Sequence, residues 1–101
     1  MTKHRYYTFN QGRLLVCHQG DTHTIPLGKE PPAFLATTAP HLFETTDGTE
    51  AYVCSTLDEH LPEGYEWTDL RASYHLLPPR TYQQAGKAAE ILYFDTHHRY
   101  C

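Results

Sequence analysis

Two adjacent prolines, Pro78 and Pro79, separate a strand-like part of the sequence from one long helical segment. Proline has no backbone N–H, so it suits the first turn of a helix, where that group has no partner within the helix. No proline follows, and Gly86 is the one weak point, at a cost of about 1 kcal/mol relative to alanine. Apolar residues recur at steps of three and four, at Tyr82, Ala85, Ala89 and Leu92. The sequence therefore predicts a helix over residues 79–101 that packs on a sheet.

The part before the prolines contains five strand-like runs: residues 5–9, 13–18, 22–27, 41–45 and 50–56. Asp47-Gly48 between the last two runs is a strong signal for a hairpin turn. Residues 28–40 and 57–64 are predicted to be loops. Residues 66–77 are predicted to form a short helix, or a turn and a helix, because Trp67, Leu70, Tyr74 and Leu77 recur at steps of three and four. The order of elements predicts an α+β fold, a mostly antiparallel sheet of about five strands followed by a short and a long helix.

Length and charge narrow the classes of function. A chain of 101 residues suits one domain. Its net charge of −4 argues against an electrostatic nucleic-acid binder, although protonation of all 8 histidines would bring the charge to +4. We find no run of about 18 apolar residues that could span a membrane, and no signal peptide. The 3 widely spaced cysteines do not resemble a disulfide framework, so a cytoplasmic protein is expected.

Three sets of side chains are candidates for chemistry. Cys17-His18, or Cys54 with His60, could form a thiol–histidine pair, but both cysteines lie in apolar strands, where the role of a small buried hydrophobe is favoured. The acidic residues around Gly64 are interpreted as a solvated connection: Asp58, Glu59, Glu63 and Glu66. Cys101 alone cannot complete the four-ligand shell of a structural zinc ion.

Residues 89–101 (AEILYFDTHHRYC) resemble the junction in bacterial NADH pyrophosphatases of the Nudix superfamily at which a helix enters a four-cysteine zinc ribbon. The matching positions, in order, are Phe94, His98, Arg99, Tyr100 and Cys101. Upstream, Thr24-Ile25-Pro26 and the hairpin around Asp47-Gly48 resemble parts of the N-terminal Nudix-like domain of that family. The resemblance implies a Nudix-like, non-catalytic domain over residues 1–97, and the start of a truncated zinc ribbon at residues 98–101.

The resemblance also implies a parent enzyme that hydrolyses NADH to reduced nicotinamide mononucleotide (NMNH) and AMP, with structural Zn²⁺ and catalytic Mg²⁺ or Mn²⁺. Cys101 would be the first zinc ligand of that parent. The 101-residue piece lacks the glutamate-rich Nudix box, so no catalytic or cofactor-binding residue, no bound cofactor and no activity are expected of it. Its expected partners are the zinc ribbon and Nudix domain of its own chain and a second copy in a homodimer, with neither membrane nor nucleic-acid binding.

Two alternatives remain open. The chain could be a free-standing interaction module that dimerises through a tyrosine-rich sheet, since it contains 8 tyrosines. It could also be a small enzyme that uses Cys17 or Cys54 as a nucleophile, which requires an accessible thiol.

Overall fold

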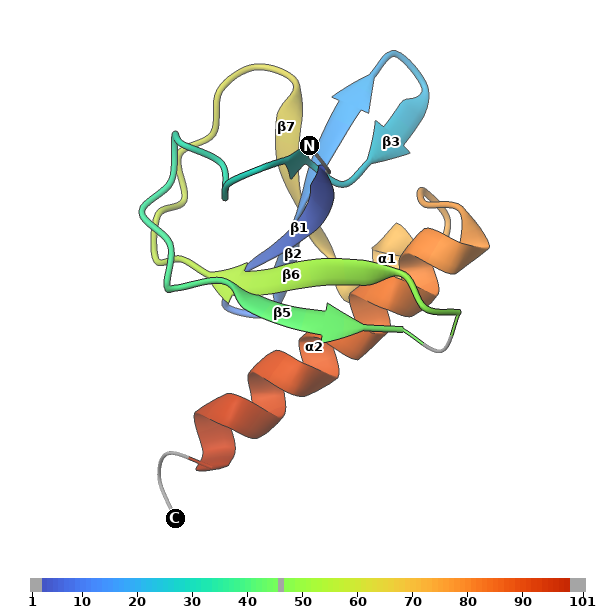
Figure 1. Cartoon of the computed structure of the whole chain (residues 1–101). Coiled ribbons are helices and arrows are strands. Elements are labelled where there is room, and N and C mark those ends of the chain that lie inside the picture. Colours follow the sequence, from blue (N-terminus) through green and yellow to red (C-terminus); the bar gives the residue numbers. More distant parts are fainter. Residues whose placement is uncertain (1–2, 46, 99–101) are drawn as a thin grey trace.

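The computed structural model describes residues 3–45 and 47–98, with side chains as far as residue 93. Within these residues a bent sheet lies across one long helix (Figure 1). Its strands are β1 (His4–Asn10), β2 (Arg13–Gln19), β3 (Thr22–Thr24), β4 (Leu27–Gly28), β5 (His41–Glu44), β6 (Glu50–Ser55) and β7 (Tyr65–Asp69). The helices are α1 (Leu70–Ser73) and α2 (Pro79–His98).

Strand β1 is the centre of the sheet. Along one edge it pairs in parallel with β6, in the register Tyr6 with Tyr52 and Phe9 with Ser55. Its other edge is antiparallel to β4 at the start of the strand and to β2 at its end. All other strand pairs are antiparallel within the part of the chain that the structure describes, so the sheet is mostly antiparallel with one parallel pair.

Residues 22–28 fill the space where β1 and β2 separate. β3 pairs with the second half of β2, and β4 then pairs with the first residues of β1. Between them Pro26 accepts a hydrogen bond from the Tyr6 backbone N–H at 3.0 Å. The predicted strand over residues 22–27 is therefore two short strands, because Pro26 has no N–H to donate to a ladder.

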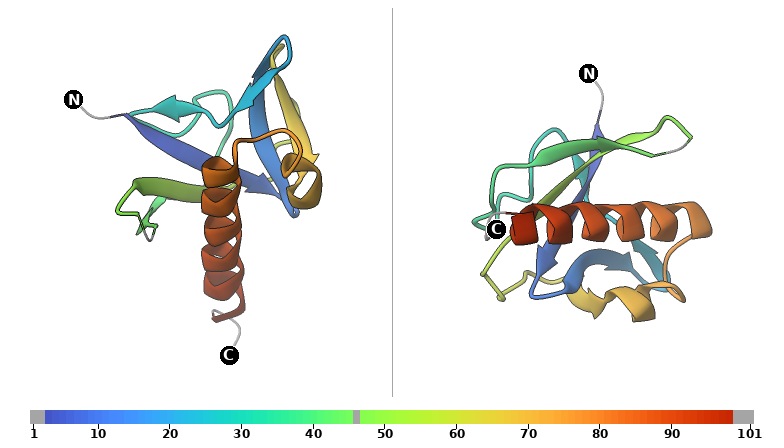
Figure 2. Two further views of the ribbon diagram at one scale, coloured as in Figure 1. Left: turned by 90° about the vertical axis from the view of Figure 1, so that its right-hand side faces the viewer. Right: turned by 90° about the horizontal axis from the view of Figure 1, so that it is seen from below.

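Helix α2 covers one face of the sheet. Its buried residues Ala85 and Ala88 pack against Tyr7, Val16 and Val53, together with other core residues of the same face: Phe9, Leu14, Ile25, Phe43, Ala51 and Leu77. Alanine on the helix lets the sheet residues approach its backbone closely. The C-terminal part of α2 extends beyond the sheet, as Figure 1 and the left view of Figure 2 show.

Loops cover the opposite face of the sheet. Tyr6 and Tyr52 stack there with ring centroids 5.0 Å apart, and the Tyr6 hydroxyl donates to the Lys29 carbonyl at 2.8 Å. Residues 57–64 are fixed by Trp67, whose Nε1 donates to the Glu59 carbonyl at 2.9 Å. Both faces of the central strands are thus buried, one by a helix and one by loops.

The predicted α+β class is confirmed, including the short and the long helix. The helix predicted within residues 66–77 is wrong for its first part, because residues 65–69 form β7, which pairs with β2 from Arg13 to Cys17. Aromatic and β-branched residues in this run, Tyr65, Trp67 and Thr68, favour a strand once an open sheet edge is available. None of the helices within the described residues is long and apolar enough to cross a membrane.

Candidate functional site

A groove with mainly apolar walls runs along the C-terminal half of α2. We call it the apolar groove; its volume is about 1190 Å³. One wall is α2 from Gly86 to Tyr93, and the other is formed by the β1–β2 turn and residues 36–38 and 55–58. Its apolar lining comprises Phe9, Ala36, Leu57, Leu70, Ala89, Leu92 and Tyr93.

Small residues on α2 create the depth of the groove. Gly86 and Ala89 are three residues apart and therefore share one face of the helix. A Cβ atom added at Gly86 would meet no atom within 4 Å, so the helix surface is open at this point. Glycine is a poor helix former. Its presence in the middle of α2 therefore leaves space at the cost of some helix stability.

The wall opposite α2 is held in place by a hydrogen-bond network around Asp58. Its carboxylate Oδ2 accepts from the Ala36 N–H at 2.8 Å, and its carbonyl accepts from Asn10 Nδ2 at 2.7 Å. Thr56 Oγ1 donates to the Ala36 carbonyl at 2.7 Å and accepts from the Asp58 N–H at 3.0 Å. These bonds connect the β1–β2 turn, the long loop and the end of β6, so the groove is formed before anything binds in it.

Two large apolar side chains at the groove are exposed. Leu57 is 87% exposed and Tyr93 is 66% exposed. Leu57 precedes Asp58, whose hydrogen bonds fix the backbone of this loop. The fixed backbone holds the Leu57 side chain in a solvent-exposed position. Complete burial of a leucine side chain is worth about 1.5–3 kcal/mol. An apolar groove bordered by such residues is suited to a protein surface that covers it.

The structure argues against Cys54 as a nucleophile. Cys54 is 1% exposed, and its Sγ lies 3.4 Å from Thr8 Oγ1. Burial raises the pKa of its thiol, which disfavours the reactive thiolate. Cys17 is half-buried in β2, where it pairs with Tyr65 and Thr24 of the neighbouring strands. His18 packs against His23 across the β2–β3 pair, at 5.8 Å between ring centroids.

Asp58, Glu59 and Glu66, three of the four acidic residues near Gly64, have structural partners. Glu59 forms a salt bridge with Arg13 at 3.0 Å, and Glu66 lies 3.5 Å from His23 Nε2. Among the described side chains, no three His, Cys, Asp or Glu residues are grouped so that they could hold a metal ion. The predicted zinc ligand Cys101 lies outside the described residues.

The comparison with protein families agrees with this architecture. The family model described as an NADH pyrophosphatase-like rudimentary NUDIX domain matches residues 3–93. The chain belongs to this family. The match spans every strand and α2 as far as Tyr93, the last residue that lines the apolar groove. No curated protein matches this rudimentary Nudix domain.

The apolar groove was not predicted from the sequence, because its walls come from segments that are distant along the chain. Gly86 was interpreted only as a weak point of the helix, and Leu57 as part of a polar connection. The available signal was the combination of two features: a glycine inside an amphipathic helix, where it lowers helix stability, and a leucine next to charged residues in a loop.

Proposed function

We propose that this rudimentary Nudix domain is the non-catalytic N-terminal domain of an NADH pyrophosphatase, an enzyme that hydrolyses NADH to NMNH and AMP. The observation that carries the proposal is the family match over residues 3–93.

The apolar groove supports a role in assembly. The groove lies along α2 from Gly86 to Tyr93. In the family that the sequence resembles, the corresponding helix leads into a zinc ribbon. A ribbon or catalytic domain that follows α2 is therefore close to Leu57 and Tyr93, and their burial would stabilise the contact. In this proposal the rudimentary domain is a preformed support against which the rest of the enzyme packs, as one subunit of a homodimer.

The metals of the enzyme belong, in this proposal, to the parts that follow. The described residues do not fit a metal ion. Structural Zn²⁺, with Cys101 as its first ligand, and catalytic Mg²⁺ or Mn²⁺ would be held by the ribbon and the Nudix box. We also place the protein in the cytoplasm, because Cys17 and Cys54 are free thiols and reducing compartments preserve thiols.

The coding sequence after Cys101 is the first test. The second cysteine of the Cys-x-x-Cys pair that Cys101 begins, one further Cys-x-x-Cys pair and a glutamate-rich Nudix box are expected there. The encoded protein is expected to release AMP and NMNH from NADH in the presence of Mg²⁺ or Mn²⁺. A stop codon directly after Cys101, or an unrelated domain, contradicts the proposal and favours a free-standing interaction module.

A pair of variants tests the role of the groove. Leu57→Asp places a charge in the apolar groove, whereas Leu42→Asp places one on β5, where Leu42 is 46% exposed and outside the groove. In the protein that includes the ribbon and Nudix domain, Leu57→Asp is expected to lower Tm and NADH hydrolysis, and Leu42→Asp to change neither. In the 101-residue chain both variants are expected to melt like the wild type. Equal effects of the two substitutions in the longer protein would rule out the groove as the interdomain contact.

A further inference from the structure

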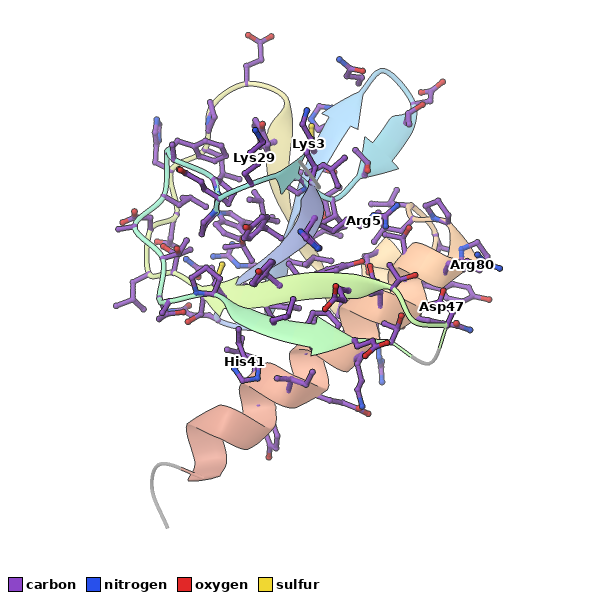
Figure 3. The ribbon with its side chains drawn as sticks, viewed as in Figure 1. Lys3, Arg5, Lys29, His41, Asp47 and Arg80 are labelled. Carbon is purple, nitrogen blue, oxygen red and sulfur yellow. The ribbon has the colours of Figure 1, made fainter. Side chains whose placement is uncertain are left out.

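A second cavity, separate from the apolar groove, lies between the β5–β6 turn and the first half of α2. Its volume is about 600 Å³. Arg80, Gln84 and Lys87 line it from α2, at spacings that place them on one face of the helix. Arg5 lines it from β1, and Glu44 and Asp47 line it from the hairpin. Figure 3 shows Arg80 and Asp47 next to each other at this end of the molecule.

In the described part of the chain, none of the three cations of this polar cavity forms a salt bridge. The pKa of Asp47 is lowered mainly by hydrogen bonds from Thr45 and Thr49, and to a smaller extent by the charge of Arg80. Positive charges that converge on one cavity raise the potential inside it, and a bound anion lowers their mutual repulsion. The first turn of α2 is also at this cavity, and free N–H groups at a helix start favour negative charge.

A buried amide adds a directed donor. Gln84 is 5% exposed, and its Oε1 accepts a hydrogen bond from the buried hydroxyl of Tyr7. This bond fixes the orientation of the amide and leaves the NH₂ group for another acceptor. Among the described residues no fully enclosed side-chain nitrogen or oxygen lacks a partner, and no partner of Gln84 Nε2 is found. The amide nitrogen therefore reaches the solvent of the cavity, where it can donate to a ligand.

The carboxylates at the opposite wall differ in their availability. Asp47 Oδ1 accepts from Thr45 Oγ1 and from the Thr49 N–H at 3.0 Å, so its charge is engaged inside the hairpin turn. The side chain of Glu44 forms no hydrogen bond or salt bridge within the residues that the structure describes. It is therefore free to accept hydrogen bonds from hydroxyl groups of a ligand.

We propose that this polar cavity binds a sugar phosphate, with the phosphate between Arg5, Arg80 and Lys87 and the sugar hydroxyls at Glu44. The Gln84 amide donates to a phosphate oxygen from the floor. The arrangement combines an anion-binding side with a hydroxyl-accepting side, and the cavity has the size of small-molecule sites, about 300–1,000 Å³. The site is independent of the apolar groove and of the proposed enzymatic parent.

Titrations of the ¹⁵N-labelled chain at constant ionic strength test the site, with inorganic phosphate, ribose 5-phosphate and ribose as probes. Phosphate and ribose 5-phosphate are expected to give saturable shifts of the amides of residues 80–87 and 47–50. Ribose 5-phosphate is expected to bind about tenfold more tightly than phosphate, the worth of one hydrogen bond to a charged group. Without saturable shifts for either phosphate the site does not exist, and equal affinities would refute the role of Glu44.

Variants assign the contacts. Arg80→Gln and Lys87→Gln are each expected to weaken phosphate binding about tenfold, whereas Lys29→Gln, which removes an exposed cation outside the cavity, is expected to change nothing. Gln84→Glu retains an acceptor for Tyr7 but removes the amide donor, and should abolish binding. Glu44→Ala should remove the preference for ribose 5-phosphate while phosphate still binds.

If Lys29→Gln weakens binding as much as Arg80→Gln, general charge attraction explains the result and the proposed site is wrong. If Gln84→Glu does not fold, Arg80→Gln decides, because Arg80 is exposed.

Discussion

Replacement of Tyr7 by phenylalanine should lower stability far more than the loss of one oxygen atom suggests. The Tyr7 side chain is 0% exposed, and its hydroxyl donates to Gln84 Oε1 and lies 3.5 Å from the Thr81 carbonyl. In Tyr7→Phe the buried Gln84 oxygen loses its partner, which costs about 2 kcal/mol. For a domain of this size that loss lowers Tm by about 8–16 °C. Differential scanning calorimetry at pH 7 measures it.

The pH dependence of the same variant separates this explanation from a simple packing defect. Burial raises the pKa of Tyr7 above its ordinary value of 10.0. Above pH 10 the unfolded chain therefore releases the Tyr7 proton while the folded chain retains it, and the free energy of unfolding falls by up to about 1.4 kcal/mol per pH unit. Tyr7→Phe has no such proton. The difference in stability between wild type and variant should therefore shrink between pH 10 and pH 11.

Tyr74→Phe is the matched control. Tyr74 is 62% exposed and its ring packs against His75 and Tyr82, contacts that phenylalanine retains. Its effect is expected to stay within about 0.5 kcal/mol. If Tyr7→Phe is as mild as Tyr74→Phe, or if its effect is the same at pH 7 and pH 11, the reasoning about the buried hydroxyl is wrong.

Three further predictions concern the hairpin, the glycines and the core. Hydrogen bonds from Thr45 and Thr49 hold the pKa of Asp47 at about 2. Asp47→Ala should therefore lower Tm at pH 7, and since this stabilisation is lost as the pH falls from the unfolded value near 4 towards 2, the two melting curves should converge in acid. Gly48 has φ +86°, so Gly48→Ala should lower the free energy of unfolding by about 1 kcal/mol or more. Gly86 lies in a helix with open space around it, so Gly86→Ala should raise the free energy of unfolding of the isolated chain by about 1 kcal/mol. Both are read from urea midpoints. Leu14→Ala, at a 0% exposed position, should cost about 2–5 kcal/mol, whereas Leu57→Ala should stay within about 0.5 kcal/mol by the same assay.

Local chemistry explains which parts of the fold were predictable from the sequence. Pro79 begins α2 as predicted, and the Asp47-Gly48 turn connects β5 to β6 as predicted. Both features depend on a few neighbouring residues whose backbone preferences are strong. The class followed from the order of these elements, with no knowledge of which strand pairs with which.

Non-local pairing decided the rest. β7 was mistaken for part of a helix because the spacing of Trp67 and Leu70 fits a helix. This segment forms a strand because it pairs with the edge of β2, which is some fifty residues away in sequence. The polar cavity was missed for a similar reason. Arg5 and Arg80 are at opposite ends of the sequence and meet only because β1 packs on α2.

The parallel pairing of β1 with β6 has a consequence for synthesis of the protein on the ribosome. Thr8 and Cys54 lie 46 residues apart in sequence yet adjacent in the sheet. A nascent chain that has emerged only through the β1–β2 hairpin therefore has an unpaired edge on β1. The apolar face of this hairpin stays exposed until α2 has also been synthesised. Such unpaired edges recruit other chains. Fragments that end before Glu50 should accordingly require chaperones to remain in solution, whereas the full 101 residues should not.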